Sequence, residues 1–474
     1  MNMKKIFLVL ITFMYFSALL SGQSFMDEEF FSTKEASYED LLKGFSASDN
    51  SLERMKIKME AAEISSEQST IKNGVSVNLS SGNGKLSFTD TGTDVSLTPS
   101  ATVTIPDLNN LAVTASMPSE IKEDGFAVKG TDVKVSADII TGNSENRKIT
   151  NLETARSLQN ARDNLSKQER GVEGDFLSAI QGIYDKASTL MQNRETYLDK
   201  LVEFDEVVVN GYSKTSSKYR IAQIEKDSAY NDCEITYREL KNLLSDFSAK
   251  CGYEVDYLVT SVPNVELLDF SSFDINNFTQ ISQALYNQEL GELKRAANKQ
   301  WTLSGNVKYS QAKQDNEVSQ SIGTGLETSW GGLGLGLDLS VPLSEQGNTS
   351  LGFNISINPF GWKTQKLTKQ NGVLDARLEQ LDVEDAYEKY SSSKRSYENQ
   401  AETLKWESEL LNEQITYYKE VRDEMSRAYK SGIINKTEYI KADNQYMKAY
   451  INLLKNRIKK IQYNIEVQKL FIEQ

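Results

Sequence analysis

The sequence predicts an α+β membrane protein with two copies of one structural repeat, each consisting of a β block and very long helices. Three observations support this fold class. The chain of 474 residues begins with an apolar segment of the export type. Its glycine-rich blocks alternate apolar and polar residues, and its proline-free tracts carry heptad patterns that recur far downstream.

Residues 1–24 have the layout of a secretory signal peptide. Lys4 and Lys5 precede an apolar run over 6–20, and small residues follow up to Ser24. This order of charged, apolar and small residues marks export, and the apolar run is short for a membrane span. No later stretch of about 18 apolar residues exists. If an exported protein of this kind enters a membrane, it must therefore do so through β-strands. Averaged hydropathy does not detect such strands, because their apolar and polar residues alternate.

The composition argues against several function classes. The net charge of −14 disfavours nucleic acid or an anionic membrane surface as the main partner. There is no histidine, so the commonest general base and metal ligand is missing. No phosphate-binding loop, nucleophile elbow or metal-spaced cluster is present, and we expect no enzyme activity and no cofactor. The two cysteines, Cys233 and Cys251, lie about 27 Å apart if they share one helix, which excludes a disulfide between them.

Proline and glycine divide the chain into alternating helical and β blocks. Prolines are absent from 30–73, 145–250, 275–300 and 363–474, and such tracts permit uninterrupted helices. The resulting organisation is a signal peptide over 1–24, a helical segment over 25–73, a β block over 74–142, a helical hairpin over 145–250, a linker over 251–274, a helix over 275–300, a β block over 301–359 and a second helical hairpin over 361–474.

The second β block has the clearer strands. Three runs alternate apolar with polar residues: 301–309, 333–343 and 350–357. One fully apolar face on strands of about this length is typical of lipid-facing strands. Trp301, Trp330 and Trp362 lie at or near the ends of these runs, where an interfacial aromatic belt would place them.

The first β block shows the same alternation more weakly. Its runs lie near 75–79, 97–105, 111–117 and 133–139. A soluble β-sandwich would show the same pattern, and on the strands alone the two readings are equally good. The export segment and the helices favour the membrane reading.

Two heptad series give the sharpest signal. The first contains Phe176, Ile183, Leu190, Tyr197 and Phe204, and the second contains Tyr397, Leu404, Leu411, Tyr418 and Met425. Spacing by seven predicts a left-handed coiled-coil seam. Each member of the second series lies 221 residues after its counterpart in the first.

The residues that end each seam keep this relation. Gly211 and Gly432 are also 221 residues apart, and beyond them Tyr219 and Tyr439 are 220 apart. The match predicts a duplicated helical hairpin with a helix of about 60 residues, a turn and a return helix of about 35–40, far longer than the usual ~11–12 residues. Gly432 suits the left-handed end of a helix, and the segment Asn435–Glu438 resembles a capping box.

This layout resembles the TolC-type outer-membrane efflux family. The distinctive residues are Tyr429-Lys-Ser-Gly432 and the following segment up to Ala442, with a looser copy from Gly211 to Ala222. The resemblance implies a homotrimer in the outer membrane. Each protomer would give about four strands to a shared transmembrane β-barrel and its long helices to a coiled-coil tunnel in the periplasm. It also implies a passive exit duct for efflux or type I secretion, working with a periplasmic adaptor protein and an inner-membrane transporter.

The β blocks depart from this family pattern because each has room for more than two strands. We expect extended hairpins rather than additional barrel strands. The hairpin tips at Gly211 and Gly432 would form the periplasmic entrance and contact the adaptor. Four acidic residues near the tips are candidates for a constriction ring: Asp205, Glu206, Asp423 and Glu424. A solvated helix face would show the same acids.

Two other functions compete with a channel. An exported coiled-coil adhesin or envelope scaffold with β-rich insertions would need no matched hairpin tips. A periplasmic adaptor would carry one helical hairpin rather than two of equal rank. The 221-residue duplication favours the channel.

Overall fold

The computed structural model describes residues 37–82, 84–89, 92–122, 125–314, 317–344 and 348–472. The predicted signal peptide therefore lies outside the described residues. The chain divides into two compact units. Among the described residues, the helical unit comprises 37–56, 164–277 and 391–472, and the sheet unit comprises those of 57–163 and 278–390.

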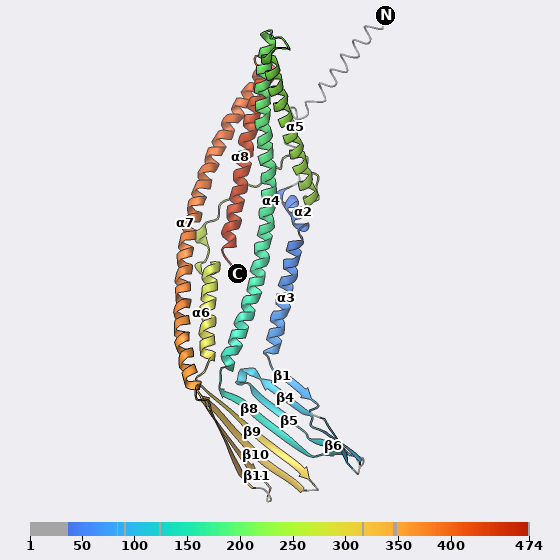
Figure 1. Ribbon diagram of the computed structural model, residues 1–474, viewed down its shortest axis with the longest axis vertical. Helices are drawn as coiled ribbons and strands as arrows, with labels where there is room; N and C mark the ends of the chain where they lie inside the picture. The colour runs from blue at the N-terminus through green and yellow to red at the C-terminus, as the bar shows by residue number, and fades with distance from the viewer. Residues whose placement is uncertain are drawn as a thin grey trace. The chain divides into compact units, whose positions relative to one another are not determined.

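The sheet unit is built on one antiparallel sheet of eight strands, with the order β1-β4-β5-β8-β9-β10-β11-β12 (Figure 1). The first repeat supplies β1 (Ser76–Ser80), β4 (Ser100–Ile105), β5 (Leu111–Ser116) and β8 (Gly130–Ile140). The second repeat supplies β9 (Trp301–Gln314), β10 (Glu317–Trp330), β11 (Leu333–Pro342) and β12 (Ser350–Ile357). The two repeats meet where β8 pairs with β9.

The expectation of about four sheet strands per protomer is wrong, because each repeat contributes four strands to this sheet. The preference for extended hairpins over additional sheet strands fails for the same reason. The first block holds a further sheet, with the order β2-β3-β6-β7: β2 (Lys85–Thr89), β3 (Gly92–Leu97), β6 (Ser119–Lys122) and β7 (Gly125–Val128). In the chain, β2 and β3 lie between β1 and β4, and β6 and β7 lie between β5 and β8. This additional sheet lengthens the first block.

Helices of the sheet unit precede and follow the strands. α3 (Asn50–Lys72) leads into β1, and α4 (Asn143–Val209) follows β8. α6 (Thr279–Ala297) leads into β9, and α7 (Gly361–Lys430) follows β12. Arg156 of α4 donates hydrogen bonds to Ser282 and Gln283 of α6, and Arg295 of α6 pairs with Glu379 of α7. Residues of these helices that lie beyond the sheet unit belong to the helical unit.

The helical unit contains α2 (Tyr38–Ala47), the later part of α4, α5 (Ser217–Cys251), the later part of α7 and α8 (Lys436–Lys469). The first heptad series forms its core: Phe176, Ile183 and Leu190 are buried. The ring of Phe176 packs against Phe45 and Phe247 with centroids 5.5 and 5.6 Å apart. The second series is less enclosed, since Leu404 alone of its five members is buried and the other four are half-buried.

Both cysteines lie on α5, and both are buried free thiols. Burial raises the pKa of the Cys233 thiol to about 12 and that of Cys251 to about 11. The thiols are therefore protonated near neutral pH, which makes them poor nucleophiles.

Candidate functional site

The two hairpin tips have the same backbone geometry. Gly211 and Gly432 adopt left-handed φ values of 74° and 72°. At the first tip the N–H of Tyr212 donates to the carbonyl of Val207, and at the second the N–H of Ile433 donates to the carbonyl of Ala428. Both are bonds of the Schellman type, which satisfy carbonyls at a helix end. Every partner in the second tip lies 221 residues after its counterpart, so the duplication extends to individual hydrogen bonds.

The return helices also begin alike. The Ser216 hydroxyl caps α5 by accepting from the N–H of Tyr219, and the Asn435 side chain caps α8 by accepting from the N–H of Glu438. Such caps satisfy N–H groups that have no partner within a helix. The helix bounds differ by 221 residues before the turn and by 219 after it, so the second turn is two residues shorter by this measure.

The four acids proposed for a constriction are exposed on two helices, Asp205 and Glu206 on α4 and Asp423 and Glu424 on α7. Arg422 donates to the Asp423 carboxylate at 2.8 Å. This bond lowers the pKa of Asp423 and keeps its carboxylate ionised near neutral pH. In one chain these acids lie near its own tips, and a ring would need several copies. The constriction ring therefore remains a prediction.

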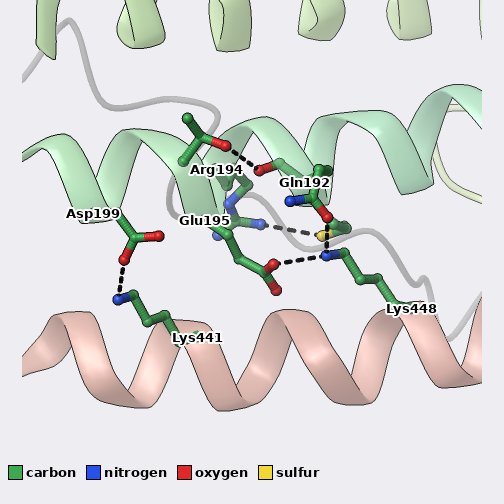
Figure 2. A network of polar contacts seen from close by, with 8 residues as sticks. Gln192, Arg194, Glu195, Asp199, Lys441 and Lys448 are labelled. Atoms are coloured by element: carbon green, nitrogen blue, oxygen red, sulfur yellow. Dashed lines mark hydrogen bonds and ion pairs between the residues drawn. The ribbon is translucent and has the colours of Figure 1, made fainter. Parts of the chain in front are cut away.

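A ladder of lysines, three on α8 that pair with acids of α4, joins the two hairpins. These lysines were not among the residues predicted from the sequence. Lys441, Lys448 and Lys455 recur every seven residues along α8. Lys441 pairs with Asp199, Lys448 pairs with Glu195 at 2.7 Å and Lys455 pairs with Asp185 at 2.6 Å, all on α4. Figure 2 shows the first two of these lysines extending from α8 toward α4. The heptad spacing of the lysines was the available signal, but their partners could be identified only from the antiparallel packing of α4 on α8.

Polar side chains are also buried beside this ladder. Arg194 of α4 (Figure 2) is 4% exposed, and Asn444 of α8 is fully buried. Burial raises the pKa of Asp443, while Arg194 and Arg422 oppose that rise. The amide of Asn444 has no hydrogen-bond partner within the described part of the chain. A buried polar group without a hydrogen bond lowers the stability of the fold.

The main sheet has one continuous apolar face. The strand registers align its members across neighbouring strands: Val77, Val103, Val113, Val135, Val307, Ile322, Leu326, Leu335, Leu337, Leu339, Phe353 and Ile355. All of these side chains are exposed; Leu337 is 54% and Phe353 is 75% exposed. Monomeric soluble proteins rarely expose a continuous apolar surface of this kind, so the face requires an apolar partner.

The three tryptophans lie together at one end of this face. Trp301 is directly opposite Trp330 in the β9–β10 register, and the Trp330 and Trp362 rings have centroids 6.4 Å apart. The Trp301 indole N–H donates to the Thr328 hydroxyl at 2.6 Å. Each ring thus combines exposed apolar surface with a position at the edge of the apolar face.

The opposite face of the sheet is polar and glycine-rich. Asp132 pairs there with Lys308 at 3.2 Å. The side chains of Asn306 and Asp338 lie over Gly325. A Cβ at this glycine would come within 2.6 and 2.8 Å of their polar atoms. Small residues on this face leave a polar hollow between the flanking side chains.

The described ranges contain no group of three or more Cys, Asp or Glu side chains placed to hold a metal ion. In the same ranges, no helix combines the length and the apolar character that a bilayer span requires.

Two family models match successive segments of the chain. Residues 41–265 match the family model described as the TP096X N-terminal domain, and residues 263–474 match the TP096X C-terminal domain. The chain therefore carries both TP096X domains in sequence. An uncharacterised protein of Treponema pallidum (strain Nichols) is 22% identical over an alignment of 306 residues, and the match covers 62% of this chain. The chain spans only 56% of that relative.

Solved structures with a similar chain include outer-membrane channels and other membrane proteins. The Campylobacter jejuni channel CmeC is 12% identical, with 95% of this chain and 91% of the other covered and a TM-score of 0.44. The open Neisseria gonorrhoeae channel MtrE is 14% identical, with coverages of 91% and 88% and a TM-score of 0.44. The Vibrio cholerae outer-membrane protein VceC is 9% identical, with coverages of 91% and 95% and the same TM-score.

Proposed function

We propose that this chain is a subunit of a TolC-type outer-membrane channel, a passive exit duct for efflux or type I secretion. The observation that carries the proposal is the exposed apolar face that runs across all eight strands of the main sheet. A bilayer supplies the apolar partner that this face lacks. The polar, glycine-rich opposite face then borders water.

The two longest strands suit this placement. β9 and β10 have 14 residues each, which is about 46 Å at the ~3.3 Å rise of a strand. Tilted by about 40°, such strands cross the ~25 Å apolar band of an outer-membrane protein and extend beyond it. The tryptophans at one end of the face would lie at the bilayer surface, as aromatic belts do.

Both edges of the sheet unit are free to pair with further copies. The outer strands β1 and β12 each have one hydrogen-bonded neighbour among the described strands, and seven antiparallel pairings make them antiparallel to each other. A rotated copy can therefore place its β1 against β12 with the correct polarity. Closure by such rotation produces a ring, which removes both free edges.

The outermost helices of the sheet unit carry matching apolar stripes. α3 exposes Ile57, Ile64 and Ile71 every seven residues, and α7 exposes Leu367 and Leu374 with the same spacing. None of the described residues of α3 is buried. Heptad stripes of this kind form coiled-coil seams, so α3 of one copy is expected to pack against α7 of the next. The family resemblance sets the number of copies at three.

The resemblance to the TolC-type family also implies where the remaining parts of the assembly would lie. The helical unit would extend into the periplasm, with its acidic residues facing a water-filled duct. The tips at Gly211 and Gly432 would bind a periplasmic adaptor and, through it, an inner-membrane transporter. Exposed acids near the tips would favour the passage of cations.

Planar-bilayer recordings together with the oligomer mass test this proposal. The purified full chain should form a trimer and give discrete conductance steps. Ile64→Glu should abolish both, because it places a charge in the α3 stripe. Lys58→Glu, an exposed substitution on another side of α3, should preserve both. A monomer, or a trimer without conductance, would overturn the proposal.

A further inference from the structure

A cavity of about 780 Å³ lies between the end of α6 and the start of α7 in the sheet unit. The ends of the strands close it from one side through Gln300, Ser329 and Asn358. Three basic residues, Arg295, Lys299 and Lys369, line it together with further hydroxyl and amide side chains. No carboxylate appears in this lining among the described residues. The cavity therefore presents hydrogen-bond donors and positive charge within a chain whose net charge is −14.

Two of the three cations are positioned by acids that lie outside the lining. Arg295 donates to both carboxylate oxygens of Glu379 at 2.7 Å, and Lys299 donates to Glu145 at 2.9 Å. These pairs hold the cavity walls in place and balance two charges. Lys369 is exposed on α7 and supplies the charge that attracts an anion.

An apolar hollow of about 350 Å³ lies on the apolar face of the sheet. Trp301, Thr328, Trp330, Leu333 and Leu335 line it. The Trp362 ring connects the two spaces: it lies against Gly331 of the cationic cavity and packs on Trp330 of the hollow, with centroids 6.4 Å apart.

We propose that the pair of spaces binds one anionic phospholipid. The phosphate lies in the cationic cavity beside Lys369, and an acyl chain runs over the Trp301–Trp330 hollow. The geometry matches the molecule, because a phospholipid also joins an anionic head to an apolar tail. The inference rests on the proposed function, since it requires the apolar face to be in a bilayer.

Native mass spectrometry of the full chain purified in detergent tests the site. Phosphatidylglycerol should bind at least about fivefold more tightly than zwitterionic phosphatidylethanolamine, since one basic side chain near an anionic lipid is worth about that factor. Lys369→Gln should weaken phosphatidylglycerol binding about fivefold. Lys389→Gln removes the same charge from an exposed position about 30 Å further along α7 and should change nothing.

Trp330→Ala separates the two halves of the site. It should weaken phosphatidylglycerol binding and leave the binding of glycerol 3-phosphate unchanged. If inorganic phosphate binds as tightly as the lipid, the site is a free-phosphate site and the lipid assignment is wrong. Equal binding of both lipids by the unmodified chain, or equal losses in Lys369→Gln and Lys389→Gln, would also overturn it. Conductance of Lys369→Gln is recorded separately and should persist, so loss of the lipid site is distinguishable from loss of the channel.

Discussion

Replacing Leu337 by arginine tests whether the apolar face contacts lipid. Leu337 lies in β11, opposite Leu326 on one side and Phe353 on the other. It is four residues from Leu333, which pairs with Trp330 in the tryptophan row. Four residues span about 13 Å, or about 10 Å of depth at a strand tilt of about 40°. In the proposed bilayer placement, Leu337 would therefore be close to the centre of the ~25 Å apolar band.

The expected loss of unfolding free energy differs between a Leu337 position that faces lipid and one that faces water. An arginine on the lipid face near the bilayer midplane costs about 2–4 kcal/mol, whereas a surface substitution in water costs within about 0.5 kcal/mol. Leu337→Arg should thus reduce the folding equilibrium constant in bilayers by about 30-fold or more. Urea titration of the protein in phosphatidylcholine vesicles, followed by tryptophan fluorescence, measures this difference.

Ser340→Arg is the matched control. Ser340 lies three residues away on the same strand, and its register places it on the polar face opposite Gly323. The same arginine should there cost little, because lumen-facing substitutions contact water. Equal free energies of unfolding for the two variants would refute the assignment of the faces.

Further predictions concern the helical unit. Lys448→Ala should lower the free energy of unfolding by about 0.5–1 kcal/mol, since it removes a partly exposed ion pair from the ladder; an unchanged urea midpoint would show that the ladder adds no stability. Gly432→Ala should cost about 1–2 kcal/mol because of its left-handed φ, while Gly174→Ala within α4 should be neutral or stabilising. With their raised pKa values, Cys233 and Cys251 should resist maleimide at pH 7.5 in the native state and react after unfolding in guanidinium; fast native labelling would contradict their burial.

The parts of the fold that are encoded locally were readable from the sequence. The left-handed Gly432 and the Asn435 cap depend on a few neighbouring residues, and both appear as expected. The strands β9, β11 and β12 follow from alternation with a period of two. The runs near 75–79 and 97–105 mark β1 and β4, but the expected number of strands in the main sheet rested on the family resemblance and was wrong, because strand pairing depends on residues 20–28 positions apart in this block. The ion partners of Lys441 and Lys448 are likewise about 250 residues away in the chain.

The internal junction between the repeats shows what the junction between copies requires. Within the chain, β8 ends the first repeat and pairs with β9, which begins the second, over ten residue pairs. The helices beside this junction, α4 and α6, are joined by Arg156 and by the pair of Lys299 with Glu145. In the proposed assembly, the corresponding strands between copies would be β12 and β1, and the corresponding helices would be α7 and α3.

The outer junction has fewer backbone bonds to offer, because β1 contains five residues. Fewer than ten residue pairs can therefore join two copies across the sheet. In the proposed assembly, the isoleucine stripe of α3 and the leucine stripe of α7 would supply the compensating apolar contact. A substitution in the α3 stripe should consequently disrupt assembly more than any single change in β1, and the opposite order would mean that the sheet edge, rather than the helices, joins the copies.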